Sequence, residues 1–184
     1  MTAMALVPSA TPDQLDPATR RQLESFADEH RHLELLRRTC AHFPAALGGV
    51  DRMYESSMAS GRLSRLLREL MFVAASDERG DRYCAEAVTD DIADRFSLDR
   101  DSINAMARGE VGGALSDAEA ALVDYARKVA RAPYKMVPGD IARLTEHGWE
   151  TPDIVEALTI VCIAGYMNTL SQTMHLEDDL VTAH

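Results

Sequence analysis

Residues 62–95 read RLSRLLRELMFVAASDERGDRYCAEAVTDDIADR, and this stretch decides the fold. In its first half, leucine, methionine and alanine recur at the spacing of one helical face. The second half shows a similar apolar stripe after a short polar turn at 78–81. The stretch therefore predicts two helices joined as a hairpin, with Glu69 inside the first and Cys84 near the start of the second.

Helix start and stop signals predict helices along most of the remaining chain. Asp16-Pro17 places a favoured N-cap before a proline in the first turn, and Ser116 with Glu119 forms a capping box. No segment of convincing length alternates apolar and polar residues as a strand does. The fold class is therefore predicted to be all-α. We expect helices at 16–27, 33–43, 44–58, 62–77, 82–95, 99–106, 116–131, 138–147 and 151–170.

One domain is expected. A chain of 184 residues that is 46% hydrophobic can bury a single sizeable core. Residues 1–15, which hold two prolines among small polar residues, are predicted to form a flexible N-terminal arm, and residues 16–184 a single all-α domain. Gly112-Gly113 is the clearest break in the pattern, but it is short enough to be an internal loop.

The longest apolar segment runs from Ile154 to Leu170. Its apolar residues surround the helix axis instead of keeping to one stripe, which predicts a central, largely buried helix. Asp153, Glu156 and Asn168 interrupt or flank the segment within a length about that of a bilayer helix, so we do not expect it to span a membrane.

Charge and cysteine content narrow the partners and the compartment. The formal net charge is −11, which argues against binding to nucleic acid or to an anionic membrane surface. The N-terminus lacks a basic region followed by an apolar core, so no secretory signal is expected. Three widely spaced cysteines, Cys40, Cys84 and Cys162, do not resemble a secreted disulfide framework. We therefore expect a cytoplasmic protein.

Glu69 has two interpretations. Arg65 precedes it by four residues, so a solvated ion pair within one helix explains a charge beside an apolar stripe. If the helix junction instead buries Glu69, its pKa rises and it can pass protons at neutral pH. The sequence leaves both open.

The cysteines also have a structural interpretation. A free cysteine usually behaves as a small buried hydrophobic residue, which is the default for Cys40 and Cys162. Cys84 differs because it lies in the first turns of a helix, where the macrodipole favours a thiolate, although Asp81 and Glu86 oppose ionisation. No metal-ligand spacing and no glycine-rich phosphate loop occur, so we expect no metal or organic cofactor.

His175 lies seven residues after Asn168, so both are expected on the same side of the last helix. Polar side chains there fit either the end of a core helix or a substrate site. Both residues are kept as candidates for substrate binding.

The motif Leu67-Arg68-Glu69-Leu70, followed by an apolar run, a polar turn and Tyr83-Cys84, resembles the carboxymuconolactone decarboxylase family. That family includes the alkyl hydroperoxidase D-like proteins. The likeness extends from about 44 to 176 and includes the late Tyr166-Met167-Asn168. The resemblance implies an alkyl hydroperoxidase D-like multi-helix bundle that assembles as a homo-oligomer, a trimer or a hexamer.

Peroxidase members of that family carry a Cys-x-x-Cys-x-x-x-His motif downstream of a glutamate. The resemblance puts the glutamate at Glu69 and the second cysteine at Cys84, whereas Asp81 holds the position of the first cysteine and Val88 that of the histidine. Without a second thiol no local disulfide can form, and without the histidine the proton relay is interrupted. The usual dithiol cycle is therefore not expected.

Three functions fit this pattern. The first is a cofactor-independent lyase, decarboxylase or isomerase acting on a small organic substrate, with Glu69 as proton shuttle. The second is a single-cysteine alkyl hydroperoxidase-like antioxidant using Cys84, and the third is a non-catalytic oligomeric protein of the same fold. The first and third are comparable, and the second is weakest. The candidate catalytic residues are Glu69, Tyr83 and Cys84, and the candidate substrate-binding residues are Asp81, Val88, Asn168 and His175.

Overall fold

The structure is a computed structural model that describes residues 6–25, 33–110 and 115–176. All regular secondary structure in these ranges is helical, which confirms the all-α class. The α-helices are α1 (Pro17–Ser25), α2 (Glu34–Cys40), α3 (Pro44–Ala59), α4 (Arg65–Glu78), α5 (Arg82–Phe96), α6 (Arg100–Ala107), α7 (Asp117–Arg131), α8 (Pro138–Glu146) and α9 (Thr151–Met174), with 3₁₀ turns at Pro12–Gln14 and Pro133–Lys135.

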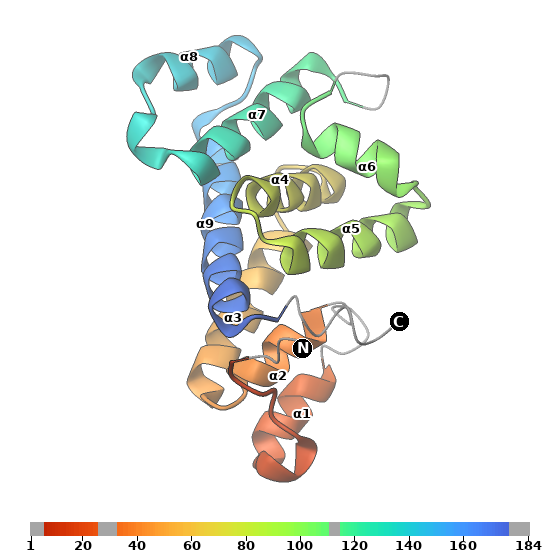
Figure 1. Ribbon diagram of the computed structural model, residues 1–184. Helices are drawn as coiled ribbons and strands as arrows, with labels where there is room; N and C mark the ends of the chain where they lie inside the picture. Colours follow the sequence, from red (N-terminus) through yellow and green to blue (C-terminus); the bar gives the residue numbers. More distant parts are fainter. Residues whose placement is uncertain (1–5, 26–32, 111–114, 177–184) are drawn as a thin grey trace.

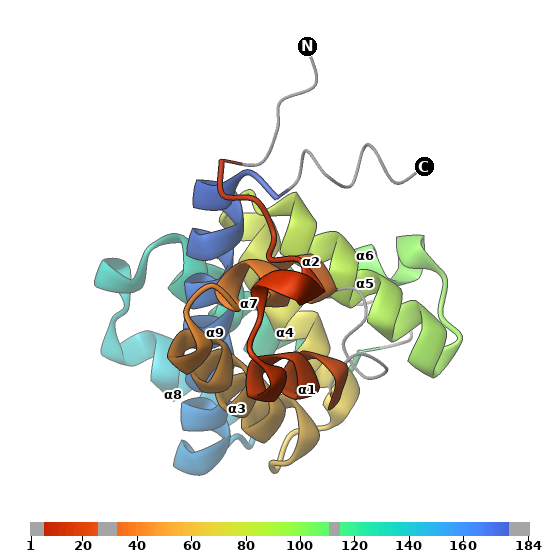
Figure 2. The ribbon, with the colours of Figure 1, turned by 90° about the horizontal axis from the view of Figure 1, so that it is seen from below.

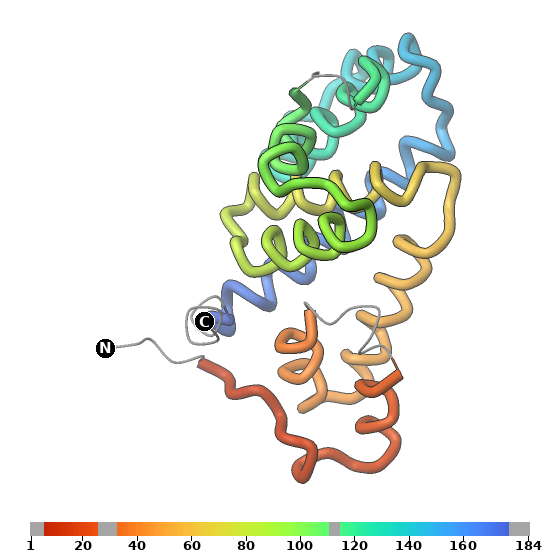
Figure 3. The backbone as a smooth tube through the Cα atoms, turned by 90° about the vertical axis from the view of Figure 1, so that its right-hand side faces the viewer, coloured from red at the N-terminus to blue at the C-terminus, as the bar shows by residue number. Residues whose placement is uncertain are grey.

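The helices follow one another from one end of the molecule to the other. Figure 1 shows α1 to α3 at one end, the α4–α5 hairpin in the middle, and α7 and α8 at the far end, with α9 running from α7 past α4 and α5 to α3. A quarter turn gives the same order, with α4 and α5 side by side (Figure 3). Seen from below, α1 to α3 lie in front of α4 (Figure 2).

The centre of the fold is α4. Every residue from Leu67 to Ser76 is buried, and the helix packs against α3, α5, α6, α7 and α9. This corrects the expectation that the helix at 151–170 is central. α9 buries one side and leaves Val155, Leu158 and Tyr166 exposed on another. The reason is that an apolar surface all round a helix does not specify which side the neighbouring helices cover.

By length and composition alone, α9 passes as a membrane span, since one stretch has a mean hydropathy of 1.5. Core helices of water-exposed proteins pass the same test. In this structure 56% of that stretch is buried inside the protein. The apolar composition of α9 is therefore explained in large part by packing against its neighbours.

Side-chain caps define the ends of the central hairpin. Ser64 accepts a hydrogen bond from the backbone N–H of Leu67 at 3.2 Å, so α4 begins at Arg65, later than the expected residue 62. Asp81 caps α5 by accepting from the backbone N–H of Cys84 at 3.0 Å. An N-cap oxygen satisfies a backbone donor that has no partner inside the helix. These two caps fix where each helix of the hairpin starts.

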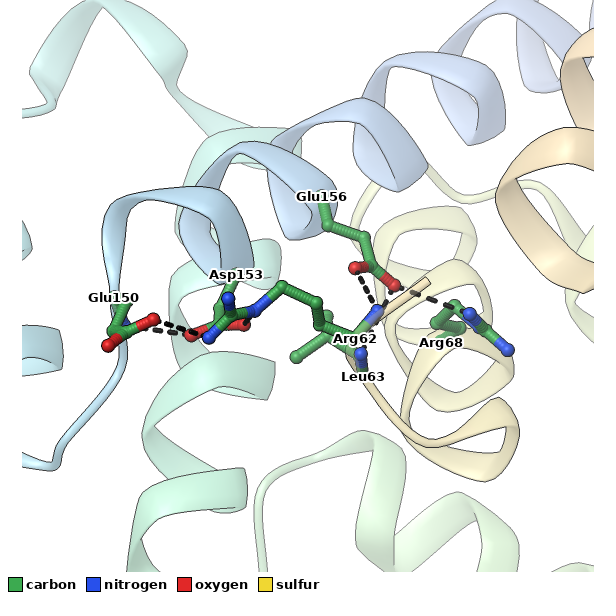
Figure 4. A network of polar contacts seen from close by, with 6 residues as sticks. All are labelled: Arg62, Leu63, Arg68, Glu150, Asp153 and Glu156. Carbon is green, nitrogen blue, oxygen red and sulfur yellow. Dashed lines mark hydrogen bonds and ion pairs between the residues drawn. The ribbon is translucent and has the colours of Figure 1, made fainter. Parts of the chain in front are cut away.

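The loop before α4 is tied to the start of α9 by charged groups (Figure 4). Glu156 accepts hydrogen bonds from the backbone N–H groups of Arg62 (2.7 Å) and Leu63 (3.3 Å) and contacts Arg68 Nη1 at 3.4 Å. The Arg62 guanidinium reaches Asp153 at 2.7 Å and also pairs with Glu150. Because these contacts join segments about 90 residues apart, they hold α4 at a fixed position along α9.

The structure also bears on the expectations for the N-terminal arm and for Cys40 and Cys162. Within the predicted N-terminal arm, Ala10 is buried and exchanges hydrogen bonds with Arg38 of α2; the flexibility of the arm stays a prediction. Cys40 is buried as expected, but Cys162 is exposed because it lies on the uncovered side of α9. Gly112-Gly113 lies outside the described residues.

Candidate functional site

Glu69 is buried in the second turn of α4, with only 2% of its surface exposed. Its Oε1 atom accepts from Arg65 Nε at 2.8 Å and lies 3.7 Å from Arg95 Nε of α5. Its Oε2 atom has no hydrogen-bond partner within the described part of the chain. The ion pair with Arg65 that the sequence suggested does form, but the carboxylate end of it is shielded from solvent.

Tyr54 of α3 is the side chain near this carboxylate that sequence reasoning missed. It is buried, and its ring packs edge-to-face on Phe72 of α4, with centroids 5.8 Å apart. Burial raises the pKa of Tyr54, and the negative charges of Asp91 and Glu69 raise it further. The phenol therefore stays protonated. The available signal was a residue with a polar tip on the otherwise apolar stripe of the 44–58 helix.

A second buried polar group surrounds Cys84, and we call it the Cys84 cluster: Ser76, Asp81, Cys84, Asn168 and Ser171. Asn168 Nδ2 donates to Asp81 Oδ2 and to Ser76 Oγ, both at 2.9 Å. The Ser171 hydroxyl also donates to Asp81 Oδ2, and it lies 3.8 Å from the Cys84 sulfur. All five residues are buried. The cluster joins the α4–α5 turn to α9.

The thiol of Cys84 is poorly placed for ionisation. Burial raises its pKa well above the ordinary value, and the negative charge of Asp81 adds to this, whereas hydrogen bonds from Ser171 and Asn168 act in the opposite direction. A protonated, fully buried thiol is a weak nucleophile. The helix start by itself would favour the thiolate, but its N-cap is a carboxylate.

The remaining candidates do not line one site with Glu69. The Tyr83 hydroxyl accepts a hydrogen bond from the backbone N–H of Leu36 at 3.2 Å, so it is used to dock α2 on α5. Val88 is fully buried in the core. His175 ends α9 in the left-handed conformation, with φ at 56°, and is exposed, whereas Asn168 is buried.

Glu69 and Cys84 lie at different levels of the hairpin. Arg95, which contacts Glu69, is near the end of α5, whereas Cys84 is in its first turn. Cys84 and Arg95 are eleven residues apart in α5, which places their Cα atoms roughly 16 Å apart along the helix axis. Tyr54 is within electrostatic reach of both groups, since Glu69 and Cys84 each affect its pKa. The structure therefore divides the expected site into a Glu69 site and the Cys84 cluster.

Comparisons with known proteins identify the fold. No protein-family model matches the chain, and no curated protein is detectably similar in sequence. Among solved structures, an uncharacterized peroxidase-related protein from Silicibacter sp. TM1040 has a TM-score of 0.81 and 20% sequence identity, covering 95% of this chain and 94% of the other.

Two further structures are similar to a comparable degree. An alkylhydroperoxidase AhpD core, an uncharacterized peroxidase-related protein from Ralstonia eutropha JMP134, has a TM-score of 0.78, 22% identity and coverage of 95% and 92%. A cysteine-to-alanine variant of the debrominase Bmp8 in complex with 2,3,4-tribromopyrrole has a TM-score of 0.79, 17% identity and the same coverage. This chain therefore has the all-helical fold of the alkyl hydroperoxidase D-like proteins.

Proposed function

We propose that this protein is a cofactor-independent enzyme that moves a proton on a small organic substrate, in a lyase, decarboxylase or isomerase reaction, with Glu69 as the proton shuttle. The observation that supports this role most directly is the burial of Glu69, which is only 2% exposed. Its Oε2 atom has no hydrogen-bond partner among the described residues. A carboxylate oxygen shielded from water and not engaged by a donor is a competent general base.

The surroundings of Glu69 support this role. Arg65 and Arg95 both approach Oε1 and so leave Oε2 as the atom able to take a proton from carbon and return it. Their side chains are 29% and 37% exposed, whereas that of Glu69 is 2% exposed. Tyr54, which burial keeps protonated, is a neutral phenol within electrostatic reach of Glu69.

The non-catalytic alternative has a cost. Leaving a buried acceptor without a hydrogen bond destabilises a protein by about 1–3 kcal/mol. A scaffold protein has no use for such an atom, whereas a proton shuttle needs one. This comparison favours an enzyme over a protein that has kept only the fold.

The single-cysteine peroxidase alternative is disfavoured by the thiol. Peroxide reduction needs a thiolate accessible to the peroxide. Cys84 is fully buried and its pKa is raised by burial and by Asp81.

The debrominase with a similar fold suggests halopyrroles as another substrate class to test.

An assay of three substrate classes tests the proposal. The wild-type protein is offered 4-carboxymuconolactone, cumene hydroperoxide and 2,3,4-tribromopyrrole, each with and without dithiothreitol. We expect turnover of the lactone, and Glu69→Gln should lower it by about 10²-fold or more, because glutamine keeps the shape but cannot exchange the proton. Glu86→Gln is the matched control, since Glu86 forms the same four-residue ion pair with Arg82 but is exposed.

Cys84→Ala separates the alternatives. Peroxide or tribromopyrrole turnover that is lost in Cys84→Ala and retained in Glu69→Gln contradicts the proposal and supports thiol chemistry. Lactone turnover that is equal in wild type and Glu69→Gln also contradicts it. Circular dichroism and thermal unfolding of each variant show that lost activity does not reflect lost folding.

A further inference from the structure

The Asp81 carboxylate is saturated with donors although it is almost completely buried, at 1% exposure. Oδ1 accepts from the backbone N–H of Cys84 at 3.0 Å, and Oδ2 accepts from Asn168 Nδ2 at 2.9 Å and from the Ser171 hydroxyl. Both carboxylate oxygens are therefore engaged by donors. A fixed negative charge is therefore placed within one helical turn of the Cys84 thiol.

The same two α9 side chains that bind Asp81 also approach the thiol. The Cys84 thiol donates to the Ser171 hydroxyl across 3.8 Å, and the interactions with Ser171 and Asn168 act to lower the pKa of Cys84. In the folded protein both donors are directed at Asp81 Oδ2. The Asn168 amide is 1% exposed and its Oδ1 atom lacks a partner among the described residues. The cluster thus holds donors that suit a thiolate but assigns them to a carboxylate.

Asp81 and two tyrosines are the ionisable groups found to interact with the Cys84 thiol in the described structure. Tyr54 of α3 and Tyr83 of α5 are in electrostatic reach of the thiol, and burial keeps both phenols protonated. Ser76 from α4, and Asn168 and Ser171 from α9, are neutral. Among the groups that act on the thiol, Asp81 is the charged one.

We propose that Asp81 is a specificity-determining residue that excludes thiol and peroxide chemistry from this fold by keeping Cys84 as a neutral thiol. It does so by placing a negative charge beside the sulfur, by capping the helix start whose dipole would otherwise favour the thiolate, and by binding the two donors that a thiolate would use. Burial and the Asp81 charge then act together to keep Cys84 protonated. This inference is independent of the role of Glu69.

Neutral caps at position 81 test the proposal. Asp81→Asn and Asp81→Ser both keep a favoured N-cap oxygen for α5 and remove the charge. The thiol is followed by the ¹³Cβ chemical shift of labelled cysteine in a Cys40→Ala/Cys162→Ala background, which reports ionisation without requiring access to solvent. We expect the titration midpoint of Cys84 to fall by at least about one pH unit in both variants, which is a roughly tenfold increase in the thiolate-to-thiol ratio.

Reactivity gives a second measurement. The thiolate attacks one oxygen of hydrogen peroxide, so that an S–O bond forms and the O–O bond breaks, giving a sulfenic acid and hydroxide, and the hydroxide becomes water by taking up the proton that the thiol lost on ionisation. Intact mass at pH 7 should show Cys84 oxidised about tenfold faster in the neutral-cap variants than in the same background with Asp81. Adding Ser171→Ala to Asp81→Asn should reverse part of the gain, because the released hydroxyl is then missing.

Two outcomes overturn the proposal. One is an unchanged Cys84 titration in folded Asp81→Asn and Asp81→Ser, which would mean that burial alone keeps the thiol protonated. The other needs no variant at position 81: a Cys84 that already titrates at an ordinary thiol pKa with Asp81 in place. Glu86, which the sequence suggested as a second opposing charge, instead pairs with Arg82 and is 41% exposed, so Glu86→Gln is the control and should leave the titration unchanged.

Discussion

At the residue scale, the two buried carboxylates of the hairpin differ in how their oxygens are used. Asp81 has a donor on each oxygen and ties α5 to α9. Glu69 has both of its arginine contacts on one oxygen and none on the other in the described structure. A saturated carboxylate is suited to structure and an unsaturated one to proton transfer. Sequence position alone did not distinguish the two.

The buried thiols make folding stability depend on alkaline pH. An unfolded thiol loses its proton near an ordinary pKa of 9.0, whereas burial raises the folded pKa of Cys40 to about 11 and that of Cys84 upward as well. Above pH 9 the unfolded state therefore binds fewer protons, and stability falls as pH rises, by at most about 1.4 kcal/mol per pH unit for each thiol.

Urea unfolding between pH 7 and pH 10.5 measures this effect. Cys84→Ala and Cys40→Ala should each flatten the alkaline decline, because each removes one group that is protonated only in the folded state. Equal slopes in wild type and both variants would contradict the assignment of the decline to buried thiols.

At the element scale, the tight loop between α3 and α4 decides how the hairpin meets α9. Gly61 has a φ of 153°, and a methyl group there would overlap the Glu156 carboxylate and lie 2.7 Å from Arg68 Nη1. Glu156 is the residue that accepts the backbone N–H groups of the loop. The loop can therefore approach α9 this closely only because residue 61 is a glycine, which has no side chain.

Gly61→Ala should destabilise the protein by about 1–3 kcal/mol, through backbone strain and displacement of Glu156. Gly139→Ala is the matched control, because nothing lies within 4 Å of its added methyl group and it sits inside α8. That change should be neutral or stabilise by up to about 1 kcal/mol. Chemical denaturation of both variants gives the comparison, and a Gly61→Ala protein as stable as wild type would contradict the role given to the loop.

At the scale of the whole molecule, the exposed side of α9 points to self-association. Val155, Leu158 and Tyr166 are 54%, 38% and 43% exposed and recur at helical spacing along the helix. A row of large apolar side chains on a long helix is costly in water and is typical of an interface. We therefore retain the prediction of a homotrimer or hexamer, now with α9 as the contact surface.

Light scattering at micromolar concentration should give three or six times the protomer mass of 20.2 kDa. Val155→Glu combined with Tyr166→Glu should shift the protein toward the monomer, because two charges would be buried at the interface. Tyr134→Glu is the control, since Tyr134 is 81% exposed but lies outside α9. A wild-type monomer, or a variant at Val155 and Tyr166 with unchanged mass, would contradict the prediction.

The sequence alone determined the helices and most of their ends. Helical periodicity and N-caps act within a few residues, so the capping box of Ser116 and Glu119 follows from local sequence. The sequence left the burial of Glu69 open. A glutamate four residues after an arginine has the same sequence pattern whether the ion pair lies in solvent or in the core.

Only the tertiary structure decided which distant groups meet. Asp81 contacts Asn168 across 87 residues, and Tyr83 contacts Leu36 across 47, and neither contact has a local signal. The Leu36 contact assigned Tyr83 to docking α2, and the packing of α3 brought Tyr54 within electrostatic reach of both Glu69 and Cys84. For the same reason the sequence did not predict which side of α9 is exposed. Burial depends on which neighbours cover a helix, and the neighbours are set by the packing of the whole chain.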